Sequence, residues 1–197
     1  MFSGSSTSTA DVNSPTKSTL TGGIIGAGAG AAVGSALATP AIGAVIGGVA
    51  GGAIGNFIGK NQTLLQQIEA SGVRVFQVGD EVRLVLRADQ FFVAGTPQLN
   101  PHSTATLDSI VTLLNRYPNA SMRVAAYTDS SGSPERNFAL SKQWAQSIAK
   151  YFWSHGIDTR VLYAVGEGAC SYVASNRTAE GRSANRRIEI SFRVLEV

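Results

Sequence analysis

The sequence predicts an α+β domain, an α/β sandwich in which helices cover one side of a mixed β-sheet, with a glycine-zipper helical hairpin in front of it. Two observations support this. The C-terminal part alternates apolar strands with amphipathic helices in the order β-β-α-β-α-β-β. Before it stand forty residues without one ionisable side chain. We therefore expect three parts: a polar tail (1–18), a glycine-rich segment (19–60) and a globular domain (61–197).

The polar tail, residues 1–18, is rich in Ser and Thr and buries too little apolar surface to fold, so we expect disorder. It lacks the charged and apolar regions of a cleavable export signal, and it has no cysteine for lipid attachment. Either an export signal was removed before Met1, or the apolar segment that follows acts as an uncleaved one.

Composition excludes several classes of function. The single cysteine, Cys170, rules out a disulfide framework or a Cys-rich metal site within one chain. The sequence shows no metal-ligand spacing, so we expect no metal and no cofactor. The net charge of +3 comes without a dense run of Lys and Arg, and nucleic acid is not an expected partner. No signature pairs Cys170 with a histidine as a nucleophile, and we expect no enzyme activity.

Glycines recur every four residues in the glycine-rich segment, which places them along one helix face. In a bilayer this pattern lets helices pack closely. Thr39-Pro40 divides the segment into helices 20–38 and 41–58, each about 28 Å long and just able to cross the hydrocarbon core. The alternative is a flexible Gly/Ala linker. Ile, Val and Leu on the other faces favour a transmembrane hairpin, with membrane contact through residues 19–59.

The globular domain begins with two alternating runs, 73–88, around the turn Gly79-Asp80. A helix follows over 102–118 because apolar residues recur at helical spacing and Pro118 ends the pattern. The segment "SMRVAAY" (121–127) is a predicted strand.

A second helix is predicted to begin at Ser133, with Pro134 in its first turn, and to end at Gly156. Two strands complete the order: "RVLYAVG" (160–166) and "NRRIEISFRV" (185–194), the latter with Ile188, Ile190 and Phe192 on one face.

Three motifs in the globular domain carry a family resemblance. They are "YTDSSGSPERNFALSKQWAQ", "VGEG" and "GRSANRRIEISF". In order and spacing they resemble the C-terminal domain of OmpA, Pal and MotB, whose pattern is T-D-x-x-G-S, then N-x-x-L-S-x-x-R-A, then G-R-x-x-N-R-R-[VI]-E. The resemblance covers residues 91–192, and the glycine segment in front is similar to YiaD-type envelope proteins. It implies a periplasmic βαβαβ-type domain that binds peptidoglycan non-covalently, without catalysis.

A site for this ligand needs an anion, a cation and nearby backbone donors, because the diaminopimelate side chain ends in both an ammonium and a carboxylate. Asp129 would supply the anion, Gly132 a tight turn, and the helix start free N–H groups. The resemblance assigns a ligand-binding role to a set of loop and helix residues. The expected site residues are Thr128, Asp129, Gly132, Asn137, Leu140, Trp144 and Arg186. For Asp129, the alternative is a loop carboxylate that only caps backbone N–H groups.

Trp144 departs from the family pattern, because it stands where the family has the arginine that grips the carboxylate. An indole has one N–H and no charge. Trp144 either contacts a partner or folds against the domain's own loop. Arg136, Lys142 or Arg186 could lend a cation, and the alternative for Arg186 and Arg187 is pairing with acids such as Glu189 or Glu180. A second departure follows the first predicted strands, where the family has Phe-Asp and this sequence has Phe92-Val93.

Two function hypotheses follow. In the first, a membrane-tethered, non-catalytic envelope protein faces the periplasm, on the outer rather than the inner membrane, and grips peptidoglycan. In the second, the domain is a structural subunit of an envelope-spanning, secretion-type complex that has lost diaminopimelate binding and docks to protein partners. Other envelope proteins or further copies of the chain are the expected partners. A channel formed by a Gly-zipper oligomer is a third, weaker alternative.

Overall fold

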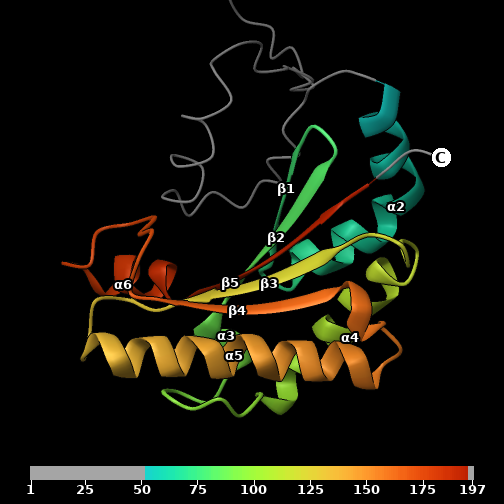
Figure 1. The fold of residues 1–197 in the computed structure, drawn as a ribbon. Coiled ribbons are helices and arrows are strands. Elements are labelled where there is room, and N and C mark those ends of the chain that lie inside the picture. The colour runs from blue at the N-terminus through green and yellow to red at the C-terminus, as the bar shows by residue number, and fades with distance from the viewer. Residues whose placement is uncertain (1–51, 195–197) are drawn as a thin grey trace, which may run out of the picture.

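The computed structural model describes residues 52–194 of the chain. The predicted tail (1–18) and most of the predicted glycine-zipper hairpin (19–60) lie outside these residues. The described elements form a mixed sheet with helices packed against it (Figure 1). The helices are α2 (Gly52–Ala70), α3 (Ala88–Phe91), α4 (Thr104–Leu114), α5 (Pro134–Ser154) and α6 (Ala179–Asn185). Short 3₁₀ turns, η1 (Pro101–Ser103) and η2 (Thr159–Val161), precede α4 and β4.

The sheet has five strands in the spatial order β1-β2-β5-β3-β4. They are β1 (Arg74–Val78), β2 (Glu81–Arg87), β3 (Met122–Tyr127), β4 (Leu162–Gly168) and β5 (Arg187–Arg193). Only β3 and β4 run parallel, since α5 crosses over between them; the other neighbours are antiparallel. The mixed sheet of the predicted α+β fold is therefore present.

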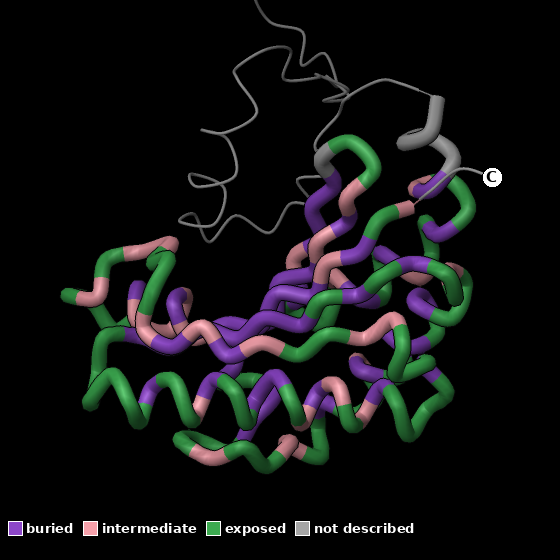
Figure 2. Tube along the Cα trace, viewed as in Figure 1, coloured by how far each residue is buried: buried purple, intermediate pink, exposed green. Residues whose placement is uncertain are grey.

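The core lies between the sheet and the helices on one of its sides, α4 and α5 (Figures 1 and 2). On β5, Ile188, Ile190 and Phe192 face this core as predicted, and all three are buried. From α5, Ile148 and Phe152 are completely buried against them. Alternation along the strands thus places one apolar face inside, and β2 and β5 keep their charged residues on the helix-free face.

α2 joins the glycine-rich segment to the domain. It runs without a break from Gly52 to Ala70, past the expected boundary at residues 60–61. Phe57, Leu65 and Ile68 are buried in the domain core, so this end of the segment is part of the folded unit. Within residues 52–194, no helix is both long and apolar enough to cross a bilayer.

Several short elements had no signal in the sequence. α3 and α6 span 4 and 7 residues, too few for a helical repeat to be read. β4 begins two residues later than predicted, because Asp158 accepts a hydrogen bond from the Arg160 N–H and caps a 3₁₀ turn. The predicted cap of α5 is confirmed: the Ser133 side chain accepts from the Arg136 N–H, and Pro134 occupies the first turn.

Candidate ligand-binding site

The loop between β3 and α5 places Thr128, Asp129 and Gly132 at one end of the sheet. Asp129 comes two residues after the end of β3, and Gly132 has φ of +89°, a conformation that side chains rarely adopt. Glycine at this position lets the chain turn from the strand into α5. The sequence-based role of Gly132 as a tight turn is confirmed by this φ value.

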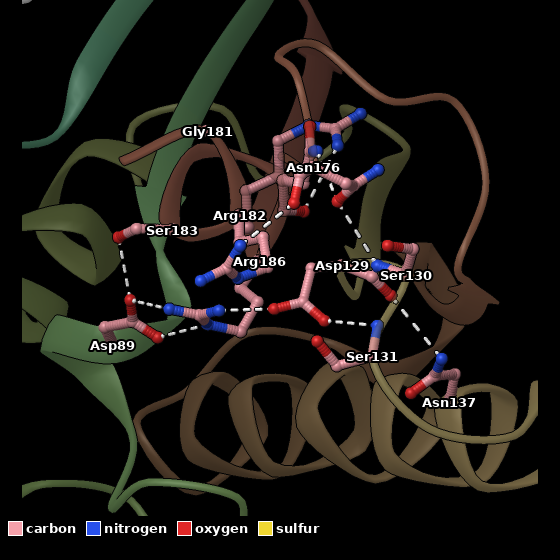
Figure 3. A network of polar contacts seen from close by, with 12 residues as sticks. Asp89, Asp129, Ser130, Ser131, Asn137, Asn176, Gly181, Arg182, Ser183 and Arg186 are labelled. Carbon is pink, nitrogen blue, oxygen red and sulfur yellow. Dashed lines mark hydrogen bonds and ion pairs between the residues drawn. The ribbon is translucent and has the colours of Figure 1, made fainter. Parts of the chain in front are cut away.

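Asp129 sits in an ion-pair network with Arg186 and Asp89 (Figure 3). Its Oδ1 accepts a hydrogen bond from the Ser131 N–H at 2.8 Å, and its Oδ2 contacts Arg186 Nη1. On the other side, Arg186 Nε and Nη2 donate to the two Asp89 oxygens, each at 2.7 Å. The guanidinium therefore bridges two carboxylates from different elements, one in α3 and one in the loop after β3.

The network shifts the acid–base properties of its members. Burial raises the pKa of Asp129, but hydrogen bonds from Ser131 and Arg186 outweigh it, and the pKa falls below its usual value. Asp89 behaves likewise, with burial opposed by Arg186 and Ser183. The hydrogen bonds that Arg186 donates to Asp89 raise the pKa of Arg186 above its usual value. At neutral pH the site therefore holds two carboxylates and one guanidinium.

Asn137, Thr128 and Leu140 complete the predicted set from strand and helix. Asn137 is buried, and its amide donates to the Asp129 carbonyl oxygen at 3.4 Å, which ties α5 to the loop. Thr128 is 2% exposed, and its hydroxyl has no hydrogen-bond partner in the described part of the chain. Leu140 is half-buried against the core rather than open to solvent.

Trp144 lies apart from this network, packed against the domain's own loop. Its side chain is 3% exposed, and its ring stacks on Phe92 with centroids 5.6 Å apart. Its Nε1–H donates to the Thr96 carbonyl oxygen at 2.7 Å. Because the single donor of the indole is taken inside the domain, this side chain presents no polar group to a ligand.

An open hollow lies beside the loop, at the start of α5. Its volume is about 440 Å³, and Gly132 and Asn137 line it together with Phe138 and Tyr172. Of the predicted site residues only Gly132 and Asn137 reach this hollow. Asp129, Leu140, Trp144 and Arg186 do not line it.

Sequence reasoning missed two polar residues. Asp89, the second partner of Arg186, stands in α3, an element too short to predict; its position directly after an apolar strand is the only signal. Asn185 is completely buried, and its Oδ1 accepts from the backbone N–H groups of Val173 and Ala174. It organises the loop before α6. Arg187 pairs with Glu189 at 2.7 Å as expected, whereas Arg186 pairs with other acids than Glu180.

Comparison with known proteins finds two family models and several relatives that are similar to this chain. Residues 91–186 match the model of the OmpA family, and residues 1–63 match the YMGG-like Gly-zipper model. "Probable lipoprotein YiaD" of Escherichia coli is 34% identical over 128 residues, which are 65% of this chain and 58% of that protein. "Peptidoglycan-binding protein ArfA" of Mycobacterium bovis is 37% identical over 92 residues, 47% of this chain and 28% of that protein. The chain therefore spans less than two thirds of these relatives.

A solved structure supports the same fold. A putative MotB-like protein from Desulfovibrio vulgaris superposes with a TM-score of 0.63 at 20% identity, over 72% of this chain and 91% of that one. Fold and motif order agree with the two family models: residues 91–186 of this chain match the OmpA family, and the segment in front of them matches the YMGG-like Gly-zipper family.

Proposed function

We propose that this chain is a non-catalytic, membrane-tethered protein of the bacterial cell envelope, with its OmpA-family domain in the periplasm. The family match and the relatives support the compartment, since they include a probable lipoprotein and a peptidoglycan-binding protein. The match of residues 1–63 to a Gly-zipper family supports the tether, because closely spaced glycines let helices pack in a bilayer.

Within this class, we infer that the domain has lost the two-charge grip on diaminopimelate and serves as a structural subunit that docks to protein partners. One observation carries this: Trp144 takes the position of the family's arginine, and it is buried with its donor used by Thr96. A missing charge-assisted hydrogen bond is worth about 1.5–3 kcal/mol, or about a ten- to a hundredfold loss of affinity.

The state of Asp129 supports the same inference. Its carboxylate is only 7% exposed, and each of its oxygens already has a donor, one from Ser131 and one from Arg186. A ligand ammonium would have to compete with a guanidinium for this carboxylate.

A second candidate, retained binding of peptidoglycan, is favoured by Arg186. Its side chain is 30% exposed and lies beside Asp129, so it offers a cation next to the expected anion. In that case Arg186, from the segment before β5, would replace the cation that α5 lacks. The bidentate pair with Asp89 counts against it, because that pair already satisfies two donors of the guanidinium.

Sedimentation with purified sacculi separates the two candidates. The detergent-solubilised full chain is compared with Trp144→Arg and Asp129→Ala, and Asp89→Asn serves as a control that weakens the ion-pair network outside the loop. Failure of the wild type to sediment, with a gain in Trp144→Arg, supports the docking subunit. Sedimentation of the wild type that Asp129→Ala abolishes overturns it in favour of the second candidate.

Because Trp144 is buried, thermal unfolding of each variant must accompany the assay. The wild-type result decides between the candidates even if Trp144→Arg does not fold. The tether has its own test: release of the intact protein from membranes by salt alone would show that the glycine-rich segment is not embedded.

A further inference from the structure

A cleft lined by arginines opens on the helix-free face of the sheet, far from the ion-pair network. Its volume is about 470 Å³. Three arginines line it, from three adjacent strands: Arg83 on β2, Arg193 on β5 and Arg123 on β3. We call these three residues, with Ser191, the arginine cleft. No role in the proposed function uses them.

Strand register explains why the three arginines converge. Arg83 and Arg123 both pair with Ser191 of the central strand β5, one from each side. At about 4.8 Å between strands, their Cα atoms lie about 10 Å apart, with the Ser191 hydroxyl between them. Arg193 follows on the same face of β5, two residues further along. All three side chains therefore leave the sheet on the face of Ser191, and the Arg123 guanidinium is paired with Glu167 of the neighbouring strand β4.

The lining of the cleft carries more basic than acidic residues, since Glu81 is the only carboxylate among them, against three arginines. Two of the arginines are paired: Arg83 with Glu81 at 2.8 Å and with Glu189 at 3.5 Å, and Arg123 with Glu167 of β4. Arg193 makes no ion pair with any residue between 52 and 194 and is exposed at the end of β5. Arg83 and Arg123 keep about two fifths of their side chains exposed, so their remaining N–H groups can still donate.

The number and placement of donors favour a phosphate group over a carboxylate. A guanidinium fork matches the oxygens of either group, but a phosphate offers more oxygens and can accept from three arginines and a hydroxyl at once. A carboxylate has only two oxygens, and two arginines are enough to satisfy it. The cleft is also shallow and lies across strands, which suits a group that approaches from a surface.

The position of the cleft in the chain identifies the source of the phosphate. Asn119, Ala120 and Ser121 also line the cleft, and they begin two residues after Tyr117, whose hydroxyl accepts a hydrogen bond from Asn61 of α2 at 2.7 Å. Arg116 donates to the Lys60 carbonyl oxygen at 3.0 Å at the same end of the domain. The first turns of α2 and the β1–β2 turn lie at the same end of the domain (Figure 1). This is where the chain enters the domain from the Gly-zipper segment.

We propose that the arginine cleft binds the phosphate of an anionic lipid headgroup and so orients the domain against the membrane that holds the tether. The orientation rests on the proposed membrane tether, whereas the phosphate binding itself does not. A basic patch near an anionic surface gains about 1 kcal/mol per Lys or Arg in general, so a three-arginine site has a measurable effect even when its members are partly paired.

Titration of the full chain in zwitterionic detergent tests the site directly. The probes are short-chain phosphatidylglycerol, short-chain phosphatidylcholine and inorganic phosphate. Calorimetry measures the binding of each. The triple variant Arg83→Gln, Arg123→Gln, Arg193→Gln removes the cleft. A matched triple variant, Arg136→Gln, Arg160→Gln, Arg177→Gln, removes the same charge from exposed arginines elsewhere.

We expect phosphatidylglycerol to bind more tightly than phosphatidylcholine, with at least a tenfold loss in the cleft variant and little change in the matched variant. Equal loss in both triple variants, or equal binding of both lipids, overturns the site. Tighter binding of inorganic phosphate than of the lipid overturns the headgroup as the source. Tighter binding of a glutamate-rich peptide than of either overturns the lipid in favour of an acidic protein.

The outcome is independent of the tether because the assay contains no bilayer. If the cleft binds phosphatidylglycerol but salt alone releases the protein from membranes, the site stands and the proposed membrane anchoring fails. If salt does not release the protein from membranes but the cleft variant binds phosphatidylglycerol like wild type, the lipid site is rejected and the proposed anchoring is not.

Discussion

Trp144 donates its indole N–H to the Thr96 carbonyl oxygen at 2.7 Å, across 48 positions of the sequence. This bond ties the middle of α5 to the segment after Phe92, where the ring also stacks. The residue that breaks the family's charge pattern is thus part of the domain's own packing. A substitution that could restore ligand binding therefore also costs stability, and the two effects have to be measured separately.

Two substitutions of Trp144 measure separately what its ring packing and its hydrogen bond contribute to stability. Trp144→Phe keeps a ring for stacking and leaves the Thr96 oxygen without its donor, so we expect a loss of about 1–3 kcal/mol in the free energy of unfolding. Trp144→Ala also leaves a cavity and should cost about 3–5 kcal/mol. Urea denaturation of the full chain measures both. Phe138→Ala, at a ring that is 54% exposed, is the matched control and should cost far less.

Acid sensitivity should follow from the ion-pair network of Asp89, Asp129 and Arg186. Both carboxyl groups have pKa values lowered from 3.8, despite burial that raises them, because Ser131, Ser183 and Arg186 donate to them. A lowered folded pKa adds stability above the unfolded pKa and loses it as pH falls below about 4 toward the folded pKa. We expect the free energy of unfolding to fall across that window.

The variant Asp129→Asn tests the source of this acid sensitivity. It removes one titrating carboxyl, so the slope of the free energy of unfolding against pH below about 4 should become shallower. Asp80→Asn, in the exposed β1–β2 turn, removes a carboxylate with no ion pair in the described residues and serves as the control. Equal slopes for both variants would assign the acid sensitivity to other groups.

The sequence predicted those parts of the fold that repeat a local pattern. The cap at Ser133, the apolar face of β5 and the end of α5 near Gly156 each have a signal within a few residues, and each is present. The site was only partly predictable. Asp129 and Arg186 stand 57 positions apart, and their contact depends on how β3 and β5 pair.

The role of Asp89 and the environment of Trp144 could be identified only from the folded structure. Asp89 meets Arg186 from 97 positions away, and no periodicity links them. For Trp144, the sequence left open whether the ring contacts a partner or the domain's own loop. In the structure the ring contacts the domain's own loop, because the segment that begins at Phe92 folds back over α5. It supplies both the stacking ring of Phe92 and the Thr96 carbonyl oxygen.

Gly166 sets how closely α5 can approach β4. A Cβ there would lie 2.3 Å from the backbone nitrogen of Lys142, a clash with main chain that a side-chain rotation cannot relieve. We expect Gly166→Ala to destabilise the domain by at least about 1–3 kcal/mol in urea denaturation. Gly59→Ala is the matched control: nothing lies within 4 Å of a Cβ at this position, and because Gly59 is exposed within α2 the change should stabilise by about 1 kcal/mol. Destabilisation by both would point to the new methyl group itself rather than to the α5–β4 contact.

Asn185 should hold the loop before α6 in place through its side-chain amide. Its Oδ1 accepts from the Val173 and Ala174 N–H groups, and its Nδ2 donates to the Ala174 carbonyl oxygen and to Asn176 Oδ1, each at 2.9–3.0 Å. Asn185→Asp keeps the shape and the acceptor but removes both donors and buries a charge.

We expect Asn185→Asp to cost more than about 2 kcal/mol at neutral pH, with part of the loss recovered as the carboxyl protonates at lower pH. Asn185→Ala removes acceptor and donors together and should not show that recovery. Hydrogen exchange of the Val173 and Ala174 amides, compared with amides of β5, measures the local effect. If these two amides stay protected in Asn185→Ala, the loop is held by other contacts, such as the hydrogen bond from Arg187 Nη2 to the Ser171 carbonyl oxygen at 2.9 Å.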